Sequence, residues 1–212
     1  ELGKINGKEY IVKTIVTTET IKTIAERNGV EMYDVYTGFK WIANVMRENE
    51  GKKNYIGGGE ESYGFLCEDF VRDKDAVSAC VILAEIAAWA KDQGLSLYQL
   101  LQKIYVEYGF SKEKGISVVK KGKSGAEEIE AMMKKFRENP LTEIAGSKVT
   151  YFYDYSTLKG KDYAENETVT LDMPTTSNVL QYFTEDNTKV SIRPSGTEPK
   201  IKFYCEVHSK VK

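Results

Sequence analysis

Tyr10-Ile-Val-Lys-Thr-Ile-Val16 decides the fold, because this β-branched, apolar run is the first of three strand candidates separated by helical periods. The other two strand candidates are residues 32–36 and 54–56. The helical periods between them are Ile21, Ile24 and Ala25, and then Phe39, Ile42, Val45 and Met46. Strands that alternate with helices in this way are typical of βαβ units and a mostly parallel sheet.

Two longer helices complete this half of the chain. Residues 75–89 carry apolar side chains on nearly every face, which predicts a buried helix that ends by Gly94. Ser96 is a candidate N-cap for a second helix, whose single apolar face runs to Tyr108 before Gly109 ends it. We therefore predict an α/β fold here, a three-layer βαβ domain over residues 1–110.

The second half predicts a different architecture. After a strand candidate at residues 115–119, Ser124 and Glu127 form a predicted capping box for a helix that Pro140 ends. Strand-like runs follow with little helix between them, at residues 149–155, 168–171, 178–184, 189–193 and 200–208. They predict an α+β domain with an antiparallel sheet over residues 111–212. Since no helix follows the last strand to cover one face of that sheet, we expect this domain to be C-terminally truncated.

The composition excludes several kinds of site and partner. The chain has 212 residues and a formal net charge of −2, so it lacks the basic excess typical of nucleic-acid-binding proteins. Its one histidine, His208, cannot build a multi-histidine zinc site, and we expect it at the surface. The widely spaced cysteines fit a reducing compartment, the cytoplasm, with Cys80 and Cys205 in the core. The longest apolar stretch, residues 77–90, falls short of the ~20 residues of a membrane span, so no membrane partner is expected.

The carboxyl ends of parallel strands share one edge of a sheet, where ligands bind. Three loops leave that edge and would bring together Thr37, Lys40, Glu60, Glu61 and Ser62. Carboxylates and a hydroxyl beside a run of glycines suit a polyol, because they accept hydrogen bonds from sugar hydroxyls while glycine admits close approach. The alternative is a strand-to-helix turn whose glycines only supply positive φ angles.

Arg72-Asp-Lys-Asp75 lies beyond that loop and allows two interpretations. Lys74 would either face the same edge as a cation or proton donor, or belong to a solvated first helical turn capped by Asp73 or Asp75.

Arg193-Pro-Ser-Gly-Thr-Glu-Pro-Lys200, between two strands, predicts a phosphate site. Hydroxyls and backbone N–H groups of such a loop can point into one concavity, and an arginine supplies a planar fork for two phosphate oxygens. Lys200 or Lys202 would add a point charge. The alternative is a hairpin turn flanked by unpaired surface cations.

These segments resemble the α-D-phosphohexomutases (phosphoglucomutase/phosphomannomutase), and the resemblance covers nearly the whole chain. Gly59-Glu-Glu-Ser-Tyr-Gly64 is similar to the sugar-binding loop of that family, and Arg193-Pro-Ser-Gly-Thr-Glu-Pro-Lys200 to its phosphate-binding loop. Thr37-Gly-Phe-Lys40 and Arg72-Asp-Lys-Asp75 match further family segments in the same order. The resemblance implies that residues 1–110 are domain III, and residues 111–212 a truncated domain IV, of a four-domain enzyme.

The resemblance also implies roles for individual residues. Glu60 and Ser62 would hold sugar hydroxyls, and Lys74, Thr37, Gly38 and Lys40 would border the reacting centre. The phosphate that is not transferred would be held by Arg193, Ser195, Gly196 and Thr197, with Lys200 and Lys202 beside them. The family's reaction moves a phosphoryl group between C1 and C6 of a hexose through a bisphosphorylated sugar. Glucose is the hexose expected for the parent enzyme of this chain.

Two parts of that chemistry have no counterpart in the sequence. The chain contains neither a phosphoserine loop of the type Thr-Ala-Ser-His-Asn-Pro nor an Asp-x-Asp-x-Asp segment for Mg²⁺. We therefore expect the parent enzyme to use Mg²⁺ held elsewhere, and this chain alone to be inactive. The alternatives are a non-catalytic phosphosugar-binding module that functions as it stands, or a phosphopentomutase parent. A nucleotide site is disfavoured, because no Gly-Lys-Ser/Thr follows the glycines.

Overall fold

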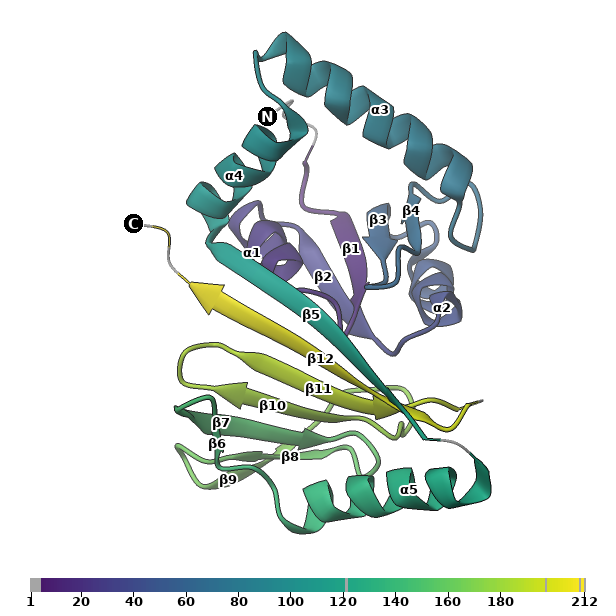
Figure 1. Ribbon diagram of the computed structural model, residues 1–212. Helices are drawn as coiled ribbons and strands as arrows, with labels where there is room; N and C mark the ends of the chain where they lie inside the picture. Colours follow the sequence, from purple (N-terminus) through teal and green to yellow (C-terminus); the bar gives the residue numbers. More distant parts are fainter. Residues whose placement is uncertain (1–4, 121, 197, 210, 212) are drawn as a thin grey trace. The chain divides into compact units, whose positions relative to one another are not determined.

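A computed structural model of the chain describes residues 5–120, 122–196, 198–209 and 211. The chain divides into two units, of which the first ends at Phe110 and the second spans Ser111–Ser209. Figure 1 labels the elements of both units, which are described in turn.

The first unit is built on a mixed, mostly parallel sheet. Its elements are β1 (Glu9–Thr14), α1 (Thr20–Arg27), β2 (Glu31–Val35), α2 (Phe39–Asn49), β3 (Asn54–Gly59), β4 (Phe65–Cys67), α3 (Ala76–Asp92) and α4 (Leu97–Tyr108). The strand order is β2-β1-β3-β4; β1 pairs in parallel with β2 and β3, and β4 is antiparallel to β3. The predicted parallel βαβ sheet is confirmed. The prediction missed β4 and placed residues 57–59 in a loop, whereas they continue β3 and pair on both sides.

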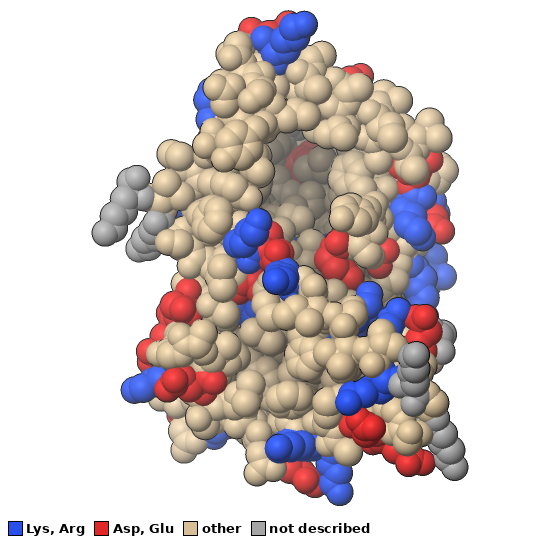
Figure 2. All heavy atoms as spheres, in the orientation of Figure 1, with Lys and Arg blue, Asp and Glu red and all other residues tan. Residues whose placement is uncertain are grey.

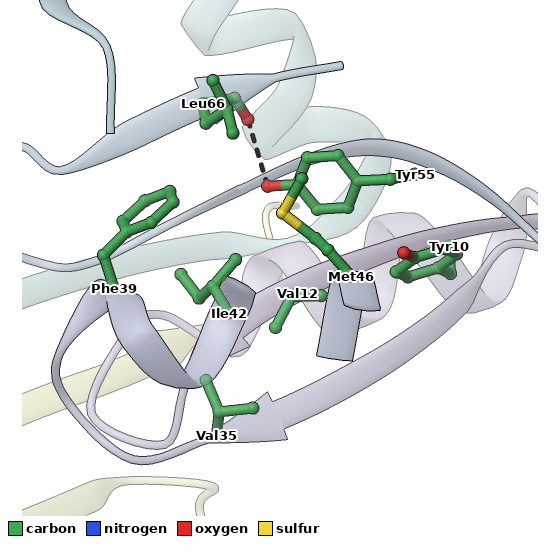
Figure 3. Packing of buried hydrophobic residues seen from close by; sticks show 8 residues of the cluster. All are labelled: Tyr10, Val12, Val35, Phe39, Ile42, Met46, Tyr55 and Leu66. Atoms are coloured by element: carbon green, nitrogen blue, oxygen red, sulfur yellow. Dashed lines mark hydrogen bonds between the residues drawn. The ribbon is translucent and has the colours of Figure 1, made fainter. Parts of the chain in front are cut away.

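The core of this unit lies between the sheet and α2, as Figure 3 shows. Side chains alternate along a strand, so Tyr10 and Val12 of β1 share the face that packs on Ile42 and Met46 of α2. The Tyr55 hydroxyl donates a hydrogen bond of 3.2 Å to the Leu66 carbonyl oxygen, which satisfies this buried phenol. Burying each large apolar side chain of this cluster stabilises the fold by about 1.5–3 kcal/mol.

The α3 helix is not the buried helix that its sequence predicts. Ala90 is its one buried residue, and Val77 is 75% exposed. In Figure 2 the surface over α3 and α4 is mostly tan, with few charged side chains. Apolar residues around the whole circumference select no single face for packing, and α3 packs chiefly on β4 and α4. Cys80 is exposed for the same reason, so its predicted place in the core is wrong.

Two of the predicted helix starts are confirmed. The Asp75 side chain accepts hydrogen bonds from the backbone N–H groups of Val77 and Ser78 at the start of α3. Ser96 and Gln99 form a reciprocal capping box at the start of α4.

The second unit is an antiparallel sheet with a helix on one face. Its elements are β5 (Phe110–Val119), α5 (Gly122–Glu138), β6 (Glu143–Ile144), β7 (Ser147–Asp154), β8 (Lys159–Asp162), β9 (Glu167–Thr170), β10 (Leu180–Thr184), β11 (Lys189–Pro194) and β12 (Lys200–Ser209). The strand order is β5-β12-β11-β10-β7-β8-β9, with β6 beside β7. Ile129 and Met133 of α5 pack on Leu180, Ile192 and Ile201 of the sheet. The predicted α+β architecture is confirmed.

Two local predictions in this unit are wrong. Ser124 lies inside α5, which begins at Gly122, so Ser124 does not cap it. In β12 the predicted alternation breaks near the end, where Glu206 is buried and Val207 is exposed.

Polar partners explain the break in β12. The Lys189 Nζ lies 3.1 Å from Glu206 Oε2, and the Ser111 hydroxyl donates to Glu206 Oε1 at 3.0 Å. His208, predicted at the surface, is half-buried, with its Nε2 2.8 Å from Glu206 Oε1. Cys205 is half-buried as well.

Helices long and apolar enough to cross a membrane are absent from the described residues.

Candidate functional site

The loop between β3 and β4 lies at the carboxyl edge of the parallel strands. We call residues 60–64 the glutamate loop; they are Glu60, Glu61, Ser62, Tyr63 and Gly64. The Glu60 N–H donates to the Gly64 carbonyl oxygen at 2.7 Å, and Gly59 pairs with Phe65, so the strand pair closes the loop tightly. The glutamate loop is therefore a hairpin turn, not the strand-to-helix turn considered as the alternative.

The two glutamates of this loop bind different neighbours. Glu60 Oε1 accepts a hydrogen bond of 2.7 Å from the Gly38 N–H, directly before α2. Glu61 Oε2 accepts one of 3.2 Å from the Thr14 hydroxyl at the end of β1. Thr14 is fully buried, and its hydroxyl lies 2.8 Å from that of Thr17. The loop is thus tied to the ends of β1 and β2, as expected for loops that leave one sheet edge.

Gly64 and Lys74 belong to the same cluster. A Cβ atom on Gly64 would lie 2.7 Å from Glu60 Oε2 and 3.3 Å from Lys74 Cδ. Both side chains therefore pass over this glycine. The Lys74 Nζ also lies 3.2 Å from Asp73 Oδ1 and 5.9 Å from the Phe39 ring centroid. The predicted Asp75 cap of α3 is confirmed, and Lys74 lies beside the glutamate loop. The role of Lys74 as a cation or proton donor stays a prediction.

The remaining predicted sugar contacts are placed less closely. Thr37 is half-buried and directly precedes Gly38. The Lys40 Nζ lies 5.1 Å from the Trp41 ring centroid, a cation–π contact. Ser62 is exposed on the loop. The structure therefore brings Gly38, Glu60 and Lys74 together. Lys40 lies beside Gly38, with its Cγ 4.0 Å from where a Cβ on that glycine would be.

A buried lysine lies within the strand that precedes this site, and sequence reasoning missed it. Lys13 has no exposed side-chain surface, and its Nζ lies 2.6 Å from Asp34 Oδ1 and 3.0 Å from Glu19 Oε1. Burial lowers the pKa of Lys13, but the two carboxylates outweigh it, so that the net pKa is raised. The sequence held one signal for this ion pair. Lys13 interrupts the mostly apolar run of residues 10–16, and Asp34 lies on the neighbouring parallel strand.

The predicted phosphate loop joins β11 to β12. Its hairpin places Arg193 opposite Lys202, and the Ser195 N–H donates to the Lys200 carbonyl oxygen at 2.8 Å. The Glu198 N–H donates to the Ser195 hydroxyl oxygen at 3.3 Å. Gly196 is exposed in this turn. Thr197, the remaining predicted phosphate ligand, lies outside the described residues.

The cations of this hairpin differ in how they are compensated. Lys200 pairs with Glu198, which lowers the pKa of that carboxyl. In the described part of the chain no carboxylate pairs with Arg193 or Lys202, and the Lys202 Nζ lies 5.9 Å from the Tyr204 ring centroid. Like charges directly opposite one another destabilise a strand pair. An anion between Arg193 and Lys202 would relieve that repulsion.

Across the described ranges, no group of three or more His, Cys, Asp or Glu side chains could hold a metal ion. The Mg²⁺ expected for a full-length enzyme therefore stays a prediction.

Comparison with protein families gives two adjacent matches. Residues 1–108 match "Phosphoglucomutase/phosphomannomutase, alpha/beta/alpha domain III", and residues 117–212 match "Phosphoglucomutase/phosphomannomutase, C-terminal domain".

Individual proteins give the same picture. The chain is 35% identical over 208 residues to a phosphoglucomutase of Staphylococcus haemolyticus, covering 98% of this chain and 38% of that protein. It is 40% identical over 197 residues to a phosphoglucomutase of Staphylococcus aureus, covering 93% of this chain and 35% of that protein. The chain thus spans little more than a third of the length of these relatives.

Solved structures share the fold at low sequence identity. A Paramecium structure titled pp63/parafusin (phosphoglucomutase) matches with a TM-score of 0.63 and 18% identity, over 94% of this chain and 33% of that one. A putative phosphomannomutase of Thermus thermophilus matches with a TM-score of 0.61 and 17% identity, over 96% of this chain and 33% of that one.

Proposed function

The chain belongs to the phosphoglucomutase/phosphomannomutase family, and on that premise we propose that it carries the sugar- and phosphate-binding loops of a phosphohexomutase. The parent enzyme would interconvert hexose 1-phosphate and hexose 6-phosphate through a bisphosphorylated sugar, with glucose as the preferred hexose. The Staphylococcus relatives, both named phosphoglucomutase, support the choice of glucose.

The observation that carries this proposal is the cross-strand pair of Arg193 and Lys202, neither of which forms an ion pair with a carboxylate among the described residues. A guanidinium donates two parallel hydrogen bonds to phosphate oxygens, while an ammonium acts as a point charge. Together they would hold the phosphate that does not react, with the Ser195 side of the turn beside it.

Glu60 is the group suited to the sugar. Its Oε1 is already fixed by the Gly38 N–H, so its Oε2 is the oxygen oriented to accept from sugar hydroxyls. A mutase must bind its bisphosphorylated intermediate in two opposite orientations. Contacts to the middle hydroxyls of the ring by Glu60 and Ser62, with one fixed phosphate site, would allow both orientations.

The transfer step needs groups that this sequence does not contain. Mg²⁺ and a phosphoserine would neutralise and carry the moving phosphoryl group in the parent enzyme. We expect the 212-residue chain to bind phosphosugars without turning them over.

The experiment is a mutase assay of the full-length enzyme with glucose 1-phosphate, comparing wild type with Arg193→Ala and Lys148→Ala. A charge-assisted phosphate contact is worth roughly 1.5–3 kcal/mol, so Arg193→Ala should raise KM by about 10-fold to 150-fold for every phosphosugar. Lys148 is an exposed cation on β7 of the same sheet and serves as the matched control, with an expected change below about 2-fold.

Three outcomes separate the alternatives. An unchanged KM for Arg193→Ala would refute the phosphate role. A larger kcat/KM for ribose 1-phosphate than for glucose 1-phosphate would make the parent a phosphopentomutase. Phosphosugar binding by a full-length protein that has no mutase activity with any substrate would favour the non-catalytic binding module.

A further inference from the structure

Tyr63 adopts a conformation that its residue type disfavours. Its φ angle is +67°, in the left-handed region that bulky side chains rarely occupy. The Glu60–Gly64 backbone hydrogen bond and the β3–β4 pairing impose this conformation on the turn. A glycine would satisfy the same turn without steric conflict. A strained residue of this kind points to a function that the side chain performs.

The Tyr63 ring makes no contribution to packing in this chain. Its side chain is 101% exposed, whereas Leu66, three residues later on β4, is fully buried. A strained backbone lowers stability and a fully solvated aromatic ring adds nothing to it, so stability does not explain the presence of tyrosine at this position.

The position of Tyr63 suits the recognition of a sugar ring. It lies between Ser62 and Gly64, on the turn whose Glu60 carboxylate passes over Gly64. Carboxylates and hydroxyls bind the hydroxyl groups of a sugar, while an aromatic ring covers the apolar C–H face of a pyranose. The glutamate loop presents both kinds of group within five residues.

We propose that Tyr63 is a specificity-determining residue, whose ring covers the apolar face of the hexopyranose while Glu60 binds its hydroxyls. This inference rests on the proposed function and deepens it. A six-membered pyranose offers the ring a larger apolar face than a five-membered pentofuranose does. Tyr63 therefore favours hexose phosphates over pentose phosphates.

The test measures binding of glucose 6-phosphate and ribose 5-phosphate to the chain by calorimetry, and KM for the corresponding 1-phosphates with the full-length enzyme. Tyr63→Gly removes the ring and relieves the left-handed strain, so this variant is expected to fold. It should weaken glucose 6-phosphate binding about 10-fold, and ribose 5-phosphate binding less than about 2-fold. Tyr63→Phe keeps the ring and should keep the wild-type ratio of the affinities for glucose 6-phosphate and ribose 5-phosphate.

Tyr98→Ala is the matched control, because Tyr98 is an exposed tyrosine of α4 away from the glutamate loop. Both affinities should be those of the wild type in this variant. Equal weakening of the two sugars in Tyr63→Gly, or no weakening, would overturn the role of Tyr63 and leave the proposed function standing. A wild-type chain that binds neither sugar phosphate would contradict both proposals.

Discussion

The Gly38 N–H donates a hydrogen bond of 2.7 Å to Glu60 Oε1, although the two residues are 22 positions apart in the chain. Gly38 directly precedes α2 and has a φ angle of +115°, which favours glycine. The Glu60 carboxylate therefore lies at the N-terminus of a helix, where the helix dipole favours a negative charge. One oxygen fixes the loop, and the other is oriented by that bond.

Replacing Glu60 should separate its two roles. Glu60→Gln keeps a carbonyl oxygen for the Gly38 N–H but loses the charge, so it should change discrimination between sugar epimers with little loss of stability. Glu60→Ala removes both the acceptor oxygen and the charge. It should therefore change sugar discrimination and also lower the free energy of unfolding by about 1–2 kcal/mol. Kinetics on a panel of sugar 1-phosphates, with urea unfolding, would check both. A uniform loss of activity across the panel in Glu60→Gln would count against a hydroxyl-binding role.

Two glycines near this loop should respond differently to alanine. In Gly64→Ala the new methyl group meets Glu60 Oε2, and the side chain can move aside by weakening its hydrogen bond to Gly38. The free energy of unfolding should therefore fall by only about 1 kcal/mol, while KM for the sugar rises. In Gly58→Ala it would lie 2.5 Å from the Val12 carbonyl oxygen, which cannot move aside, and stability should fall by about 1–3 kcal/mol. Thermal unfolding of both variants, together with the mutase assay, tests this contrast. The prediction is wrong if Gly64→Ala is the less stable of the two variants.

The buried Lys13 predicts a stability that is lost at high pH. Its folded-state pKa is raised above the ordinary 10.5, so its stabilisation is complete below that value and disappears as the pH rises through the raised pKa. Lys13→Met should lower stability by about 1–2 kcal/mol at pH 7, because Asp34 and Glu19 lose their partner but reach solvent. Urea unfolding from pH 7 to 11 should show that the difference in stability between the wild type and Lys13→Met narrows only above pH 10.5. A difference that narrows already near pH 8 would contradict the raised pKa.

Asp186 predicts the opposite dependence at low pH. It lies between β10 and β11, where hydrogen bonds from the Thr184 hydroxyl and from Thr188 lower its pKa to about 2. The stabilisation is present above the ordinary pKa of 3.8 and is lost as the pH falls through about 2. Asp186→Ala should be less stable than wild type at pH 7, and this difference in free energy of unfolding should shrink towards pH 2. Denaturant titrations at both pH values would measure it. An equal difference at both values would mean that the Asp186 charge is not involved.

Local patterns in the sequence were sufficient for much of the fold. The hydrophobic periodicity predicts β1, α1, β2 and α2 correctly, because each of these elements buries one face against its immediate neighbours in sequence. Ser96 was identified as a cap because capping depends on residues within one helical turn. The sequence also singled out residues 60–64 and 193–200, which the structure places in the turns between β3 and β4 and between β11 and β12. The ligand roles of these two loops stay predictions.

Contacts over long distances in sequence could not be read in this way. The burial of Glu206 depends on Lys189 and Ser111, which come from other strands. The alternation of β12 alone therefore predicted Ile201 correctly but placed Val207, and not Glu206, inside. The bond between Glu61 and Thr14 joins residues 47 positions apart. The exposure of α3 was hidden because an apolar pattern on every face cannot show which face is covered.

The short strand β4 has a consequence for self-association. Residues 57–59 form a strand without side chains, and such a flat backbone is a template on which a strand of another molecule could add. β4 occupies one side of these glycines and β1 the other. The outer edge is then only three residues long, Phe65–Cys67, too short to recruit a foreign strand readily. The hairpin that presents the glutamate loop thus also protects the glycine strand from aggregation.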